Sequence, residues 1–276
     1  MNSVEVFVDT QDRLGEGPIW WKAEDALAWV DILDGEIHVA DWDGNHLETM
    51  RMPEPVGCLF EQPDGSLIAG CRSGLRTVPY GRLILPLPPS RVPIRINDGK
   101  VDPQGRLVFG TMGHPDVAAA AGVLWRYDGN GLVALREGVT ISNGLDWVDD
   151  GRRMLFVDTP TQSIEMFDYA DEGTPIRSLG VWADLGTVTG VPDGLAHSAT
   201  HGTFVAMWNG AQVLQLQDGR TAHSFETVVR RPTSVLLHPH RDAIVVTTAR
   251  NAEEHVRGCR LAGAVLYFPL TLHDMA

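Results

Sequence analysis

One polar residue recurs at a nearly constant distance ahead of a turn, six times along this chain. The segment Arg95-Ile96-Asn97-Asp98 shows the layout clearly, because Asn97 precedes the turn residue Gln104 by seven positions. In the other units the offset is seven to nine residues. The six positions are Glu16, Gly57, Asn97, Asn143, Asp193 and Ser234. A radial repeat that brings one such residue from each unit to a common centre would build a polar site without any local motif.

Two carboxylates, Glu16 and Asp193, and two amides, Asn97 and Asn143, fall in this predicted ring. Carboxylates that converge repel each other unless a cation or a proton joins them. An all-oxygen set suits a hard divalent ion such as Ca²⁺, Mg²⁺ or Mn²⁺, while three protein ligands with open positions also suit Zn²⁺ or Fe²⁺. A cation with an open position beside a carboxylate polarises a carbonyl group and activates water. The ring therefore points to hydrolysis of an ester or lactone.

The turns divide the chain into units of 39 to 51 residues. Each turn is followed by two short strands, which alternating apolar residues and β-branched or aromatic side chains predict. The first strands are expected at 26–30, 66–69, 106–109, 154–157, 203–206 and 243–246. The second strands are expected at 37–39, 75–78, 123–127, 164–167, 213–216 and 265–268.

Six units of this size fit one blade each of a six-bladed β-propeller, an all-β fold, which we expect to form a single domain over residues 1–276. A β-sandwich would not produce six near-equal units. We expect each polar residue just ahead of its strand, at the mouth of the central channel. The N-terminal strand, 4–8, is expected to close the last blade.

The amino-acid composition limits the kinds of binding partner and the compartment that we expect for this protein. The net charge is −14, from 22 basic and 36 acidic residues, which disfavours binding to nucleic acid. The N-terminus lacks the features of a signal peptide, and no run is long enough to span a membrane. Three scattered cysteines, Cys58, Cys71 and Cys259, predict free thiols in a reducing compartment. We expect a cytoplasmic protein without membrane contact, as a monomer or weak homodimer.

Several motifs in order resemble those of the gluconolactonase/regucalcin family, which includes senescence marker protein and luciferin-regenerating enzymes. Each motif alone is weak, but together, at blade spacing, they are specific and cover nearly the whole chain. They are Gly15-Glu16-Gly17-Pro18, Arg95-Ile96-Asn97-Asp98-Gly99-Lys100, Ser142-Asn143-Gly144-Leu145, Pro192-Asp193-Gly194-Leu195, Arg231-Pro232-Thr233-Ser234 and Leu261-Ala262-Gly263-Ala264.

The resemblance implies a propeller that binds one divalent cation and hydrolyses sugar lactones to sugar acids. By the same resemblance Glu16, Asn143 and Asp193 are the expected metal ligands, and Asp193 is also the general base. Arg95 and Asn97 are expected to hold the substrate.

One stretch of the chain departs from the family pattern. After Met112 some relatives carry an acidic residue that touches the sugar, and here Asp116 or His114 is expected to take that place.

Two alternatives stay open at the level of sequence. One is a non-catalytic propeller that binds Ca²⁺ or a small ligand. The other is an esterase or acyl-lactonase, for which Met112, Met207 and Trp208 would form an apolar pocket rim. A serine nucleophile is disfavoured, because the chain has no Gly-x-Ser-x-Gly segment.

Overall fold

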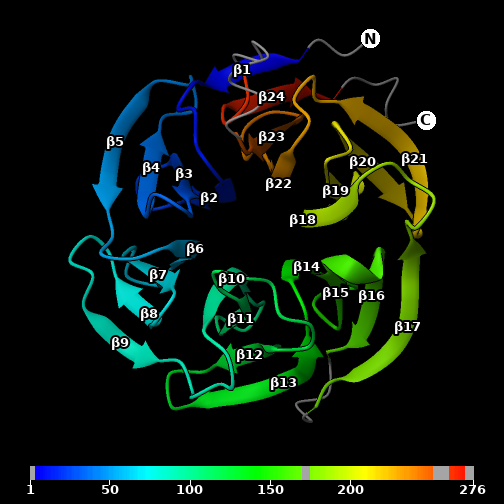
Figure 1. The fold of residues 1–276 in the computed structure, drawn as a ribbon. Helices are drawn as coiled ribbons and strands as arrows, with labels where there is room; N and C mark the ends of the chain where they lie inside the picture. The colour runs from blue at the N-terminus through cyan, green and yellow to red at the C-terminus, as the bar shows by residue number, and fades with distance from the viewer. Residues whose placement is uncertain (1–3, 170–174, 251–260, 271–276) are drawn as a thin grey trace.

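The computed structural model describes residues 4–169, 175–250 and 261–270. Within them the chain forms six four-stranded antiparallel sheets, arranged as the blades of a ring (Figure 1). The innermost strands face the centre of the ring, and the outermost strands form its rim. The predicted six-bladed β-propeller is confirmed.

Blades one to three follow one another along the chain. Blade one comprises β2 (Gly15–Trp21), β3 (Ala26–Asp31), β4 (Glu36–Ala40) and β5 (His46–Arg51). Blade two comprises β6 (Val56–Glu61), β7 (Leu67–Cys71), β8 (Gly74–Thr77) and β9 (Leu83–Pro86). Blade three comprises β10 (Ile94–Val101), β11 (Leu107–Gly113), β12 (Gly122–Tyr127) and β13 (Leu132–Val139).

Blades four to six complete the ring. Blade four comprises β14 (Ser142–Val148), β15 (Arg153–Asp158), β16 (Ser163–Asp168) and β17 (Arg177–Asp184), with a short 3-10 turn, η1 (Thr159–Thr161), between β15 and β16. Blade five comprises β18 (Val191–Ser198), β19 (Gly202–Trp208), β20 (Gln212–Gln217) and β21 (Arg220–Glu226). Blade six comprises β22 (Pro232–Leu237), β23 (Ala243–Thr248), β24 (Val265–Pro269) and β1 (Glu5–Val8).

The ring is closed by the first strand of the chain. Strand β1 pairs antiparallel with β24, and Glu5 lies opposite Tyr267 (Figure 1). The expected closure of the last blade by an N-terminal strand is therefore correct. Because the first and last strands share one sheet, backbone hydrogen bonds join the two ends of the ring.

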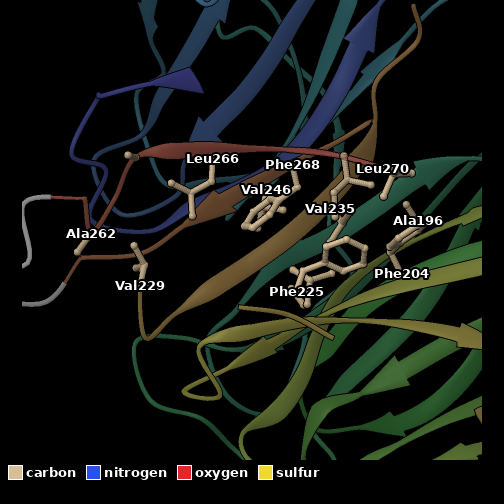
Figure 2. Close-up of a cluster of buried hydrophobic side chains, with 14 residues drawn as sticks. Ala196, Phe204, Phe225, Val229, Val235, Val246, Ala262, Leu266, Phe268 and Leu270 are labelled. Atoms are coloured by element: carbon tan, nitrogen blue, oxygen red, sulfur yellow. The ribbon is translucent and has the colours of Figure 1, made fainter. Parts of the chain in front are cut away.

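Apolar side chains fill the space between neighbouring blades. Figure 2 shows the cluster between blades five and six, where Phe204 and Phe225 meet Val246 and Phe268. The rings of Phe225 and Phe268 lie 6.1 Å apart at an interplanar angle of 73°, an edge-to-face contact between blades. Replacing such a buried Phe with Ala typically costs about 3–5 kcal/mol. Packing between the blades thus holds the inner strands at fixed positions around the channel.

The prediction missed the first strand of every blade and the fourth strand of blades one to five. It placed the six polar residues ahead of a strand, whereas the structure places them inside the innermost strands, such as Asn97 in β10 and Asn143 in β14. These segments were hard to identify because glycine, asparagine and aspartate are depleted in strands. Their pairing is also irregular, so they lack a clean alternation of apolar and polar residues.

Two of the three cysteines lie in the described part of the chain. Cys58 and Cys71 are free thiols and are buried, while Cys259 lies outside the described residues. Burial raises the pKa of the Cys71 thiol to about 12. In the described ranges, no helix has the length and apolar character needed to cross a membrane.

Candidate functional site

An irregularity in the pairing marks the ring position of every innermost strand. In β10, for example, the register shifts between Ile96 and Asp98, which leaves Asn97 without a partner in the ladder. Shifts also leave the ring residue without a partner in β6, β14 and β18. In β2 and β22 the shift lies directly beside the ring residue, which keeps its partner. A β-bulge of this kind bends the strand and re-aims a side chain. The repeated bulge therefore accounts for side chains that point toward the channel at one level.

The glycines that follow the ring residues allow the innermost strands to approach closely. A Cβ atom on Gly144 would lie 2.5 Å from the backbone nitrogen of Leu195. A Cβ atom on Gly194 would lie 2.2 Å from Oγ of Ser234. Asn-Gly and Asp-Gly pairs are typical of turns. Here they lie inside strands, where the contact with the next blade requires glycine.

Four of the six ring residues line one cavity of about 230 Å³. These residues, which we call the floor, are Glu16, Asn97, Asn143 and Asp193. All four are buried, and the carboxylates of Glu16 and Asp193 belong to residues that are each only 5% exposed. The other two ring residues, Gly57 and Ser234, are not among the lining residues. The structure thus brings together the three expected metal ligands and two of the three expected substrate-binding residues, Asn97 and Arg95.

The two floor carboxylates lie within hydrogen-bonding reach of each other. Burial, and then the charge of Asp98, raises the pKa of Glu16 to about 8, although the N–H of Gly17 donates to its Oε2 at 2.9 Å. Burial and then the charge of Glu16 raise the pKa of Asp193 well above its ordinary value. Both carboxyl groups therefore favour a bound proton, or a cation in its place.

The third expected ligand, Asn143, is held by hydrogen bonds on both sides of its amide. Asn97 donates from Nδ2 to the carbonyl of Ser142 at 2.7 Å and to Oδ1 of Asn143 at 2.8 Å. Asn143 donates from Nδ2 to Oγ1 of Thr159 at 2.7 Å. Thr159 lies on η1 and also lines the cavity, and the sequence prediction did not include it.

The donor set fits a hard divalent cation. Two carboxylates and one amide oxygen belong to the lining of a small cavity, and among the described residues Arg95 is the one cationic side chain that lines it. In the described ranges there is no group of three or more His, Cys, Asp or Glu side chains that could hold a metal ion. The floor offers two such residues, and an amide oxygen of Asn143 would be the third ligand. Oxygen donors of this kind are those that Ca²⁺, Mg²⁺ and Mn²⁺ prefer.

Arg95 lies at the same cavity with part of its guanidinium unpaired. Its Nη1 donates to the carbonyl of Ile96 at 3.1 Å, and its buried Nε has no partner among the described residues. Burial lowers the pKa of Arg95 to about 10, while the nearby carboxylates of Glu16 and Asp193 act in the opposite direction. The side chain therefore remains a cation with a free donor beside the two carboxylates.

The cavity has a second level, which is largely apolar and which we call the collar. Leu14, Arg95 and Ile141 each precede a floor residue by two positions, about 6–7 Å in extended chain. Arg95 lies in β10, while Leu14 and Ile141 lie immediately before β2 and β14. Ile32, Met112 and Trp208 belong to the same level. Met112 pairs with Arg95, and Trp208 with Val191, in their sheets. Arg95 is the one charged residue of this collar.

Asp116 does not line the cavity. It is exposed, in the segment between β11 and β12, so its expected contact with substrate is not supported by its position. The register of this segment was ambiguous in the sequence, because the segment contains no repeat marker. His114 is partly buried, and burial and the charges of Arg95 and Arg72 lower its pKa. Met207, expected at the rim, is instead buried in a core cluster.

Comparison with known proteins identifies the family. The sequence profile of the SMP-30/gluconolactonase/LRE-like region matches residues 14–250. The chain belongs to this family. It is 32% identical over 250 residues to the pentonolactonase XacC of Haloferax volcanii, a match that covers 88% of this chain and 84% of that protein. It is also 32% identical to the 6-deoxy-6-sulfogluconolactonase of Pseudomonas putida, over 80% of this chain and 78% of the relative.

Solved structures agree with this family assignment. A calcium-binding protein, regucalcin, from Agrobacterium tumefaciens superposes with a TM-score of 0.85 at 25% identity, covering 97% of this chain and 93% of that one. A luciferin-regenerating enzyme superposes with a TM-score of 0.83 at 21% identity, which shows the shared fold. The resemblance predicted from the sequence motifs is thereby confirmed.

Proposed function

We propose that this protein is a divalent-cation-dependent lactonase that opens a sugar-derived lactone to the corresponding sugar acid. The observation that carries the proposal is the pair of buried carboxylates, Glu16 and Asp193, in one cavity with the Asn143 amide and the Arg95 guanidinium. The names of the two relatives described above, a pentonolactonase and a sulfogluconolactonase, support lactone hydrolysis as the reaction.

Glu16, Asn143 and Asp193 would hold the cation through oxygen atoms. Its identity is one of Ca²⁺, Mn²⁺, Mg²⁺, Zn²⁺ or Fe²⁺. When bound, the cation supplies Lewis acidity toward the lactone carbonyl oxygen and its charge offsets that of the two carboxylates. Burial and neighbouring carboxylates raise the pKa values of Glu16 and Asp193, and a bound cation would offset both effects.

In the proposed reaction Asp193 acts as the general base. Its carboxylate accepts a proton from a water molecule as the water oxygen bonds to the lactone carbonyl carbon. The bond between that carbon and the ring oxygen then breaks, and the ring oxygen takes up the proton held by Asp193 to become a hydroxyl group, which restores the carboxylate. Arg95 would donate from Nε to a substrate oxygen, and Asn97 would accept from a substrate hydroxyl through Oδ1.

Asp193→Ala and Asn143→Ala test the assignment against a panel of aldonolactones with Mn²⁺, Ca²⁺, Mg²⁺, Zn²⁺ or Fe²⁺ added singly. Loss of the general base is expected to lower kcat by about 10²–10⁴-fold. Asp128→Asn, on the exposed turn after β12, is the matched control and keeps wild-type activity. Cation binding without turnover of any lactone by the wild type would instead support the non-catalytic alternative.

The esterase alternative has one observation in its favour. Met112 and Trp208 line the cavity, so its collar is partly apolar as that alternative requires. Aryl esters and acyl-lactones belong in the same panel. A higher kcat/KM for these than for every aldonolactone would favour the esterase.

A further inference from the structure

A continuous chain of hydrogen bonds links three blades beneath the cavity. It begins at Asn97 of blade three, passes through Asn143 and Thr159 of blade four, and ends at the carbonyl of Pro192 in blade five. The last bond, from Oγ1 of Thr159 to the Pro192 carbonyl, is 2.9 Å long. Pro192 directly precedes Asp193, so the chain connects two of the proposed cation ligands.

The two ends of this chain fix the direction of every bond in it. The Pro192 carbonyl can only accept, so the Thr159 hydroxyl must donate its single proton there. Oγ1 of Thr159 therefore acts as an acceptor toward Asn143, and the group that faces it must be the NH₂. This places Oδ1 of Asn143 on the opposite side of the amide.

The other end of the chain gives the same orientation independently. The Ser142 carbonyl can only accept, so the Asn97 group that faces it must be its NH₂. That NH₂ also donates to Asn143, which must present Oδ1. A carbonyl oxygen has two lone pairs, and one of those on Oδ1 remains for a ligand.

Thr159 itself is held in place by the backbone. Its N–H donates to the carbonyl of Ile141 at 3.1 Å, and the preceding Asp158 accepts from the N–H groups of Thr140 and Ile141. These bonds tie η1 to the start of β14, two residues before Asn143. Thr159 is 9% exposed, so its hydroxyl has little access to water that could replace these partners.

We propose that Thr159 is a positioning residue that holds the Asn143 amide with Oδ1 toward the cation. This inference rests on the proposed function, because it assumes that Asn143 is a cation ligand. Without the hydroxyl, the Asn143 NH₂ would be buried without an acceptor, and only the hydrogen bond from Asn97 would still orient the amide. The Pro192 carbonyl next to Asp193 would lose its donor as well.

Thr159→Val removes the hydroxyl and keeps the shape, while Thr159→Ser keeps the hydroxyl and removes the methyl group. Calorimetric titration of cation-free protein with Mn²⁺ and with Ca²⁺ measures the effect. Loss of a partner that orients a ligand typically weakens metal affinity by about 10–100-fold, which we expect for Thr159→Val. Thr159→Ser should bind close to the wild-type affinity.

Thr227→Val is the matched control for the loss of a buried hydroxyl. Thr227 is fully buried, donates to the carbonyl of Val229 at 2.6 Å and does not line the cavity. It should lower stability and leave cation affinity unchanged. A crystal structure of Thr159→Val adds a readout that is independent of binding, and we expect the Asn143 amide to leave its wild-type orientation.

The possible outcomes test the positioning role of Thr159 separately from the proposed cation dependence. Wild-type affinity in Thr159→Val, or an Asn143 amide that stays in place in that variant, would overturn the positioning role. An affinity loss of equal size in Thr159→Ser would do the same, because the hydroxyl would then be irrelevant. If the wild type binds neither cation, the titration is repeated with Mg²⁺, Zn²⁺ and Fe²⁺. If none of the five binds, the proposed cation dependence fails, and the orientation of Asn143 in the crystal still decides the positioning claim.

Discussion

The floor and the collar of the cavity lie next to each other along the chain, yet their chemistry differs sharply. Three residues of the floor, Glu16, Asn97 and Asn143, are polar, while two of the three residues two positions earlier, Leu14 and Ile141, are apolar. The third, Arg95, is charged. The floor can therefore hold a cation and polarise a bond, and the collar limits which molecule reaches it. One repeated strand geometry thus supplies both reactivity and selection, at adjacent inward-facing levels.

The largest expected effect is a loss of folding stability at high pH, caused by the carboxylates of the floor. The folded-state pKa of Glu16, about 8, is higher than its ordinary value of 4.5, so the folded protein binds this proton more tightly than the unfolded chain. The corresponding stability is fully present below pH 4.5 and is lost as pH rises through about 8. At 1.36 kcal/mol per pKa unit, the loss is at most about 5 kcal/mol. Asp193, whose pKa is also raised, acts in the same direction.

Urea unfolding of the cation-free protein between pH 5 and pH 9 measures this loss. Glu16→Gln should flatten the pH dependence, and a saturating divalent cation should restore stability most at high pH. A free energy of unfolding that is unchanged from pH 5 to pH 9 in chelator would show that the floor carries no unbalanced charge.

A smaller effect is expected from the packing that keeps the floor level. Gly144→Ala would place a Cβ atom 2.5 Å from the backbone nitrogen of Leu195, so blades four and five must separate. Overpacking of this kind typically costs about 1–3 kcal/mol. Gly131→Ala is the control, since a Cβ atom there meets nothing within 4 Å. Thermal unfolding compares the two variants, and equal Tm values would mean that the inner strands are not in close contact.

The smallest effect is expected at the collar. Ile141→Asn adds a polar group beside the floor without touching the proposed ligands. We expect kcat/KM to rise for D-ribono-1,4-lactone relative to 5-deoxy-D-ribono-1,4-lactone, because the added amide can pair with the extra hydroxyl. A single side-chain contact of this kind changes discrimination by about tenfold. A ratio equal to that of the wild type would show that the collar does not contact this part of the substrate.

Much of the fold and of the floor could be predicted from the sequence. Turns and apolar strands at regular spacing predicted the six blades, and the offset to each turn predicted the floor. The inner strands themselves were missed, because Asn143-Gly144 and Asp193-Gly194 look like turns and become strand bulges only against the next blade.

Two parts of the cavity, Thr159 and the collar, were recognised only from the structure. Thr159 lies in a turn outside the repeat and meets Asn143 only through the fold of blade four, so no spacing rule identifies it. The collar did carry a signal, since Leu14, Arg95 and Ile141 share one offset from the ring. Asp116 was placed by analogy in a segment with no repeat marker, and it lies outside the cavity.

The central claim is that lactone hydrolysis depends on a divalent cation held by Glu16, Asn143 and Asp193. The most direct test is the rate of aldonolactone hydrolysis by the wild-type protein before chelation, after chelation, and after single cations are added back. The account predicts that turnover is lost on chelation and is restored by at least one of Ca²⁺, Mn²⁺, Mg²⁺, Zn²⁺ or Fe²⁺. Turnover that persists unchanged in the chelated protein would contradict it.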